Sequence, residues 1–324
     1  MKNIKNIAVV YGGFSSEVEI SVQSGKCVSA WLRNAGYNVY EILLLKESWN
    51  VVDGNRTYPV DKNDFSCTIN DKKVTFDNVY IIIHGNPGEN GILQAYFEML
   101  DIPFVGCSSL TTAVSFDKNT CKSYLRNVAD YLAEDVCIRK DGDYNIDDIL
   151  RRLKLPVFVK PTNGGSSFGV TKVKKAEELK PAIEEAFKEG DTVLIEEAVV
   201  GREIDCGVYK NKDGVFALPL IEIVPKNEFF DYEAKYLGAS DEICPAPIEE
   251  EYASRVQKEA VKIFKHLGCK GLVRLDFIVT DKGEPYFLEV NPNPGMTANS
   301  LVPKMVREQG MKMEDFLKSI IEAE

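Results

Sequence analysis

The sequence predicts an α/β protein whose C-terminal part is α+β. In the first hundred residues, short apolar runs alternate with helical apolar spacing, which is typical of a parallel sheet covered by helices. The middle of the chain continues with strands and helices around a turn rich in glycine and serine. From about residue 198, hairpin patterns surround one long helix. We therefore expect three closely packed domains, at residues 1–106, 107–197 and 198–324.

The composition excludes several classes of protein. The chain has 324 residues, 44% of them hydrophobic, which is enough for a large core. A formal net charge of -11 disfavours a nucleic-acid partner. The eight cysteines form no CxxC pair, and two histidines are too few for a histidine-based zinc site. Because no apolar run suits a signal peptide or a membrane span, we expect a soluble, cytoplasmic protein without a membrane partner.

The first domain is predicted from its strand and helix signals in order. An apolar strand at 7–11 ends at a glycine pair, and a helix over 21–35 leads to a second strand at 39–45. A third buried strand, at 79–83, ends at His84 and is followed by a helix over 92–100. This alternation predicts a parallel sheet covered by helices.

The remaining elements follow from the same patterns. In the second domain we expect a helix after Lys118, a strand at 156–160, a helix over 176–188 and a strand at 192–196. In the third we expect a hairpin of 204–209 with 215–224, a helix over 249–267, and a hairpin of 271–280 with 285–290.

The second hairpin carries polar side chains among apolar ones. Side chains alternate along a strand, so Arg274 and Asp276 share one face, and Glu289 and Asn291 share a face of the partner strand. Two carboxylates on an apolar sheet need a compensating cation, and oxygen ligands suit Mg²⁺ that bridges phosphates. The alternation alone is also typical of a solvent-facing hairpin edge.

A loop rich in glycine and serine follows the strand at 156–160. Its backbone N–H groups and hydroxyls suit a cover over phosphates, with Lys160 supplying positive charge. It lacks the Gly-Lys-Ser/Thr ending of a P-loop, so we expect a turn between two strands, and a plain surface turn is the alternative. The polar, aromatic stretch 231–236 is typical of a loop that either is solvated or closes over a site.

These motifs occur in a fixed order over essentially the whole chain. They are 12–17, His84-Gly85 with 88–91, Phe116-Asp117-Lys118, Lys160 with 165–169, 231–236, 268–276 and 288–297. In this order they resemble the ATP-grasp superfamily and, within it, the D-alanine–D-alanine ligases. The resemblance implies the ATP-grasp fold with an N-terminal parallel α/β domain, and ATP held between the central and C-terminal domains.

The resemblance also implies how ATP is bound. Lysines would contact its phosphates, one of them from a lid loop, and the end of the strand at 192–196 would hold adenine. Two Mg²⁺ ions, or Mn²⁺ as a substitute, would bind Asp276, Glu289 and Asn291. The implied ATP contacts are Lys118, Lys160, Ser166, Ser167, Phe168, Glu196, Glu197, Val199, Glu203, Lys235 and Leu288.

Substrate and catalytic residues are implied in the same way. The first D-alanine would lie near Glu17 and His84, and the second near Ser300 and Leu301. Three catalytic roles are implied. Side chains joined by hydrogen bonds would link the three domains around the substrates, a lysine would contact the γ-phosphate of ATP, and an oxyanion site would stabilise negative charge on the reacting oxygen. The implied catalytic residues are Glu17, Ser166 and Tyr236 for the hydrogen bonds, Lys235, and Arg274 with the backbone N–H of Gly295 for the oxyanion.

The implied reaction joins two D-alanines for peptidoglycan precursor synthesis. ATP would convert one carboxylate to an acyl phosphate, and the amine of the second D-alanine would displace phosphate. The resemblance implies a homodimer through the N-terminal domain.

Asn90, Glu197 and Pro292-Asn293 depart from the family's pattern. A D-Ala–D-Ser or other D-Ala–D-X ligase, or a nucleotide-binding regulator without turnover, are the alternatives, and Tyr236 argues against a D-lactate acceptor.

Overall fold

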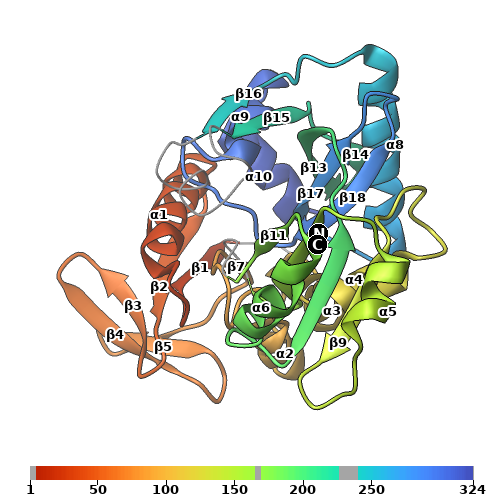
Figure 1. Ribbon diagram of the computed structural model, residues 1–324. Coiled ribbons are helices and arrows are strands. Elements are labelled where there is room, and N and C mark those ends of the chain that lie inside the picture. The colour runs from red at the N-terminus through yellow and green to blue at the C-terminus, as the bar shows by residue number, and fades with distance from the viewer. Residues whose placement is uncertain (1–4, 165–168, 226–239, 324) are drawn as a thin grey trace.

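The computed structural model describes residues 5–164, 169–225 and 240–323 (Figure 1). Within them the strands form three sheets, which lie in the ranges 6–105, 135–197 and 202–291. Their mixture with helices confirms the predicted α/β class, while the proposed domain boundaries stay a prediction. In the described part of the chain, every helix is too short or too polar to cross a membrane.

The N-terminal sheet has eight strands, and half of them are antiparallel. The order is β6-β5-β4-β3-β2-β1-β7-β8, and the parallel strands are β1 (Asn6–Gly12), β2 (Asn38–Leu44), β7 (Asn78–Ile81) and β8 (Phe104–Val105). The prediction of a parallel sheet was wrong for the other four, which are β3 (Trp49–Asp53), β4 (Arg56–Asp61), β5 (Ser66–Ile69) and β6 (Lys72–Val74).

Tight turns and an aromatic cluster explain this antiparallel arm. Positive φ angles at Gly54, Asn70 and Asp71 permit reversals too short for a crossover helix. The ring of Phe65, 1% exposed, makes an edge contact with Phe97 at a centroid distance of 4.8 Å, so the arm is packed onto helix α2 (Ile92–Met99). Helix α1 (Val18–Asn34) begins three residues before the predicted start, and the strand predicted at 79–83 ends at Ile81.

The central sheet has four strands, and the two strands on either side of the glycine-rich loop are neighbours, as predicted. Its order is β11-β10-β12-β9, formed by β11 (Thr171–Val173), β10 (Val157–Pro161), β12 (Thr192–Glu197) and β9 (Asp135–Arg139). Strands β10 and β11 pair in antiparallel fashion, so the loop joins neighbouring strands. Helices α5 (Ile146–Arg152) and α6 (Ala176–Ala186) add Ile149, Leu179 and Ile183 to the sheet's buried apolar cluster. Helices α3 (Ser109–Phe116) and α4 (Lys118–Leu125) precede this sheet.

The C-terminal sheet holds the predicted carboxylate hairpin at one edge. Its strands are β16 (Ser240–Ile243), β15 (Ile221–Pro225), β13 (Arg202–Asn211), β17 (Leu272–Val279) and β18 (Pro285–Asn291), with β14 (Gly214–Ala217) also paired to β13. The single strand predicted at 215–224 is two strands, because Pro219 lacks the N–H that a ladder needs. Helix α8 (Glu250–His266) follows β16, and α9 (Leu301–Glu308) and α10 (Met313–Ile321) follow β18.

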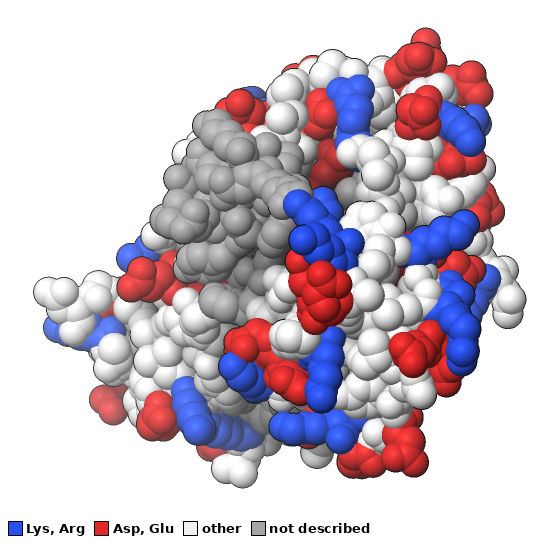
Figure 2. Space-filling model, in the orientation of Figure 1, with Lys and Arg blue, Asp and Glu red and all other residues white. Residues whose placement is uncertain are grey.

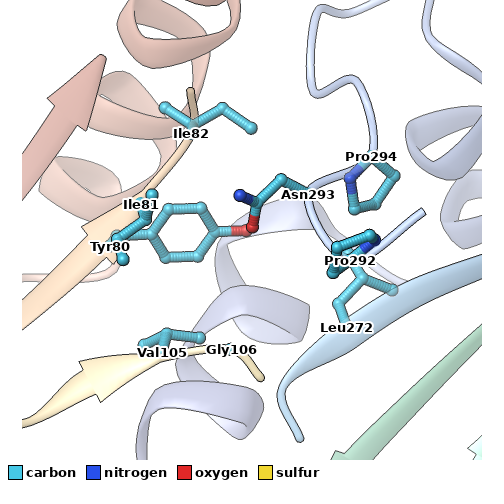
Figure 3. Close-up of a pocket in the computed structure, with 9 residues that line it drawn as sticks. All are labelled: Tyr80, Ile81, Ile82, Val105, Gly106, Leu272, Pro292, Asn293 and Pro294. Atoms are coloured by element: carbon cyan, nitrogen blue, oxygen red, sulfur yellow. The ribbon is translucent and has the colours of Figure 1, made fainter. Parts of the chain in front are cut away.

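The first and third sheets are joined by a shared core and a polar contact. Val28 and Leu32 of α1 belong to the same buried cluster as Phe316 and Ile320 of α10. In a small pocket beside this core, the ring of Tyr80 points toward Asn293, in the loop after β18 (Figure 3). The Asn293 amide nitrogen donates to the carbonyl oxygen of Gly88 at 2.7 Å, a contact between distant parts of the chain.

We expect Asn293→Ala to destabilise the protein by roughly 1–3 kcal/mol, because a buried carbonyl then loses a donor. Urea unfolding of the variant measures this loss. The control is Asn211→Ala, which removes an acceptor from an exposed turn and should change the unfolding free energy by less than about 0.5 kcal/mol. Equal effects of the two substitutions would contradict a joining role for Asn293.

Candidate active site

Strands β17 and β18 bring the predicted polar residues together. Asp276 lies opposite Glu289, and Arg274 lies opposite Asn291. Arg274 donates from Nε and Nη2 to the two carboxylate oxygens of Asp276 at 2.7 and 2.8 Å, and the Asn291 amide donates to Asp276 at 2.9 Å. The shared face predicted from alternation is therefore confirmed as a set of direct contacts.

A third carboxyl group lies beside this hairpin. Asp205 on β13 is the cross-strand partner of Asp276 and is only 1% exposed. Burial, and then the Asp276 carboxylate, raise the pKa of Asp205 well above its usual value. Burial alone would lower the pKa of the Arg274 guanidinium, but the neighbouring Asp276 and Asp205 raise this pKa well above its usual value. Arg274 Nε lies 3.2 Å from Asp205 and 2.7 Å from Asp276, so one cation is shared by two acids.

The donor set fits a hard divalent cation. It combines the carboxylates of Asp276 and Glu289 with the side-chain oxygen of Asn291, on neighbouring strands of one face. No three His, Cys, Asp or Glu residues of the described ranges form a metal cage by themselves. An ion held here would therefore take its remaining ligands from phosphate oxygens and water, as Mg²⁺ does.

Lys118 connects this hairpin to the glycine-rich loop. It is the first residue of α4, where the Asp117 side chain caps the helix by accepting from the N–H of Thr120 at 2.7 Å. The Lys118 ammonium donates to the carbonyl oxygen of Gly164 at 2.9 Å and lies 3.8 Å from Glu289 Oε2. The structure thus places a lysine between the predicted phosphate loop and the predicted metal ligands.

Lys160 is held in a buried charge network. Its ammonium donates to Glu196 Oε1 at 2.8 Å, and Lys122 donates to Glu196 Oε2 at 3.2 Å. Burial alone would raise the pKa of the Glu196 carboxyl, but Lys160 and Lys122 lower it to about 2. The predicted phosphate residue Lys160 and the predicted adenine residue Glu196 are therefore direct partners. The neighbouring Glu197 instead accepts from the N–H of Lys154 at 2.7 Å.

Glu17 and His84 lie at the carboxyl end of the N-terminal sheet. Glu17 occupies the N-cap position of α1, and His84, 7% exposed, follows β7. Burial lowers the pKa of His84, whereas the nearby Glu17 carboxylate raises it. Glu89 accepts from the N–H of Gly85 at 2.7 Å, and burial raises its pKa to about 8. The pKa of His84 and that of Glu89 also respond to Arg274, so these groups lie near the hairpin.

Gly295, Ser300 and Leu301 lie in the segment between β18 and α9. A Cβ atom at Gly295 would come within 3.0 Å of Ser300 Oγ, so a larger residue would crowd this serine. Ser300 Oγ also accepts from the N–H of Thr297 at 3.0 Å, and Leu301 begins α9. This segment is tied to α1, because the N–H of Met296 donates to Ser24 Oγ at 3.3 Å.

Three further predicted residues lie on the strands of the site or next to them. Val199 lies just beyond β12, Glu203 near the start of β13, and Leu288 on β18. Their roles stay predictions. The predicted residues Ser166, Ser167, Phe168, Lys235 and Tyr236 lie outside the described residues.

Three ionisable residues were missed by sequence analysis, the buried Lys122 and Asp205 and the half-buried Glu89. Lys122 follows Lys118 by one helical turn, and Asp205 shares a face of β13 with Glu203, so both had a periodic signal. Glu89 stands inside a motif that was noted without giving it a role.

On the face shown in Figure 2, acidic and basic side chains are interspersed among the described residues.

Known protein families match both parts of this architecture. Residues 6–107 match the family described as D-ala D-ala ligase N-terminus, and residues 128–322 match D-ala D-ala ligase C-terminus. The chain belongs to the D-alanine–D-alanine ligase family. The resemblance drawn from the motifs is thereby confirmed.

Members of the D-alanine–D-alanine ligase family match the chain from end to end. A D-alanine–D-alanine ligase of Phocaeicola vulgatus is 45% identical over 320 residues, which cover 98% of each chain. The VanG D-Ala:D-Ser ligase of Enterococcus faecalis has a TM-score of 0.89 at 32% identity, covering 98% of this chain and 99% of its own. D-alanyl-alanine synthetase A of Vibrio cholerae has a TM-score of 0.87 at 29% identity, covering 99% and 98%. These matches confirm the ATP-grasp fold.

The buried network predicts a pH-dependent role for Glu196 in stability. Because its pKa in the folded chain is about 2, below the ordinary 4.5, ionised Glu196 stabilises the fold above pH 4.5. This contribution is lost as pH falls from 4.5 toward 2. We expect Glu196→Gln to cost roughly 3–5 kcal/mol at neutral pH, since two buried lysines lose their carboxylate. The difference from wild type should shrink in acid.

Urea unfolding from neutral pH down to about pH 2.5 measures this difference. The control is Glu177→Gln, an exposed site on α6, which should follow the wild type at every pH. A penalty for Glu196→Gln that stays constant across this range would show that the carboxylate is not held ionised by the lysines.

Proposed function

We propose that the chain is an ATP-dependent ligase that joins two D-alanines, with release of ADP and phosphate. The proposal is supported most directly by the position of Lys118, which contacts Gly164 of the glycine-rich loop and lies 3.8 Å from Glu289. A phosphate group bound under this loop would meet both a lysine and the carboxylate hairpin. Full-length relatives that carry this name support the choice of substrates.

The proposed reaction has two steps, and the site must stabilise negative charge in both. A carboxylate is a poor acyl donor, so transfer of the γ-phosphoryl group from ATP first makes it an acyl phosphate. The amine of the second D-alanine then attacks the carbonyl carbon, and phosphate leaves. Both steps concentrate negative charge on oxygen, which Arg274 and the backbone N–H of Gly295 would offset. In the same way Lys118 and Lys160 would offset the charge of the ATP phosphates.

We propose that Asp276, Glu289 and Asn291 hold Mg²⁺, as two ions or with Mn²⁺ as a substitute. When bound, the ions would offset phosphate charge and align the nucleotide. Arg274 now pairs with both oxygens of Asp276, so a bound cation would compete with this pair. Asp205, 3.2 Å from Arg274 Nε, offers the guanidinium group a second partner if a cation displaces it from Asp276.

A D-Ala–D-Ser ligase is the second candidate. The enterococcal D-Ala:D-Ser ligase shares the fold closely, and Ser300 and Leu301 are the residues we propose beside the second substrate. The 45% identity to the D-alanine–D-alanine ligase of Phocaeicola vulgatus, compared with 32% to the D-Ala:D-Ser ligase, favours D-alanine. We further propose a homodimer, and a cytoplasmic location that suits the eight free cysteines and a role in peptidoglycan precursor synthesis.

We expect ADP release from ATP to require D-alanine and to proceed with D-alanine as acceptor in preference to D-serine or D-lactate. A coupled assay of ADP release, combined with identification of the dipeptide, measures this preference. Higher kcat/KM with D-serine would replace the proposed function by the second candidate. ATP binding without any turnover on these substrates would instead support a regulator.

We expect Glu289→Gln to lower kcat at least about tenfold and to raise the Mg²⁺ concentration needed for half-maximal rate. The fold should persist, because the substitution removes a charge and keeps the shape of the side chain. The control is Asp281→Asn, at the turn of the same hairpin, which should have wild-type kinetics. Normal activity and Mg²⁺ dependence of Glu289→Gln would show that the hairpin is only structural.

A further inference from the structure

Lys122 is a buried lysine to which the reaction outlined above gives no role. It lies on α4 and is 2% exposed. Its ammonium group donates to the carbonyl oxygen of Ala133 at 3.0 Å and to Glu196 at 3.2 Å, and it pairs with Asp135 Oδ2 at 2.8 Å. Two of these oxygens accept hydrogen bonds from the ammonium group, whereas Asp135 Oδ2 lies at ion-pair distance without accepting a hydrogen bond. A buried charge that depends on such partners is held in position, because a shift would leave the charge and its partners unpaired.

Glu196 transmits this fixed position to Lys160. Its Oε2 accepts from Lys122 and its Oε1 accepts from Lys160, and both Glu196 and Lys160 are 7% exposed. Lys122 thus fixes one end of the carboxylate, and the other end fixes the ammonium group of Lys160. Without Lys122, Glu196 keeps Lys160 as its charged partner but loses the contact that sets its own orientation.

Helix α4 transmits the same constraint to Lys118. Residues four apart lie on one face of a helix, so Lys118 and Lys122 point toward the same side of α4. Lys122 ties this face to Glu196 on β12 and Asp135 on β9, which are neighbouring strands. One turn earlier, Lys118 reaches Gly164 at 2.9 Å. The rotation of α4 about its axis therefore sets where the Lys118 ammonium group lies.

We propose that Lys122 is a positioning residue of the nucleotide site, which fixes Lys160 through Glu196 and fixes Lys118 through helix α4. It does not touch the nucleotide. The inference rests on the proposed function, since it assumes that these two lysines contact phosphates. It assigns to Glu196 a second task besides any contact with adenine, because both of its carboxylate oxygens are committed to lysines.

The test compares binding of Mg·ADP, measured by calorimetry, with kcat and the KM values for ATP and D-alanine. We expect Lys122→Met to weaken Mg·ADP binding and to raise KM for ATP by about tenfold or more, as when support behind a ligating side chain is lost. The KM for D-alanine should change by less than about threefold. Lys122→Arg keeps the charge and should recover most of the nucleotide affinity.

One control variant separates positioning from stability. Lys262→Met removes ion pairs with Asp130 at 2.7 Å and Glu259 at 2.6 Å, so it should lower the thermal midpoint yet keep nucleotide affinity within about twofold. Asp135→Asn, which removes the ion pair of Lys122 but keeps its hydrogen bonds to Glu196 and Ala133, should weaken Mg·ADP binding less than Lys122→Met does. If Lys122→Met lowers the midpoint but binds Mg·ADP like the wild type, the proposal is wrong.

A double-mutant cycle tests the route through Glu196. If Lys122 acts through that carboxylate, Lys122→Met and Glu196→Gln together should weaken Mg·ADP binding less than the product of their separate effects. Independent, multiplicative effects would overturn this route. Should Lys122→Met fail to fold, Lys122→Gln keeps a donor for the Ala133 carbonyl oxygen and carries the same comparisons. Failure of the wild type itself to bind Mg·ADP would reject the proposed function, whereas wild-type binding by these variants would reject the role of Lys122 alone.

Discussion

The distribution of buried charge between two sheets determines much of this structure. On the C-terminal sheet, the carboxyl groups of Asp205, Asp276 and Glu289 lie on successive strands, with Arg274 among them. On the central sheet, Lys160 and Lys122 share Glu196. Taking ionised groups out of water is costly unless partners lie close by, so each of these positions depends on its neighbours. The lysines near the central sheet and the carboxyl groups of the C-terminal sheet come together where Lys118 lies 3.8 Å from Glu289.

This arrangement explains why the glycine-rich loop and the carboxylate hairpin lie close together. Lys118, at the start of α4, donates to the carbonyl oxygen of Gly164 in the loop after β10 and forms an ion pair with Glu289 of the C-terminal sheet. The phosphates of ATP, together with bound metal ions, would fit between the lysines and the carboxylate hairpin. The lysines would contact the phosphates on one side, and the oxygens of the hairpin would bind the metal ions on the other. Because Arg274 lies among three carboxyl groups, a divalent cation bound there would offset negative charge that remains on this side of the site.

Sequence patterns predicted the local parts of this site well and its long-range parts poorly. Alternation placed Arg274, Asp276, Glu289 and Asn291 on one face, because a hairpin fixes its own register. It did not reveal Asp205, which joins them through pairing between strands separated by helix α8. Lys122 was missed for a related reason, since a lysine on a short helix resembles a solvated one until its partners on β9 and β12 are known. The arm of strands β3–β6 was missed because its turns were not weighed against the parallel pattern on either side.

The shared core of α1 and α10 has a consequence for how the chain reaches its folded state during synthesis. Val28 and Leu32 leave the ribosome early, yet Phe316 and Ile320, which pack in the same cluster, are made only after the two other sheets. Until then this apolar surface is open to water or to other chains. The N-terminal sheet is thus synthesised first, but the apolar face of α1 is covered only when α10 has been made. Translation speed, or a chaperone that binds α1, would therefore influence the yield of native protein.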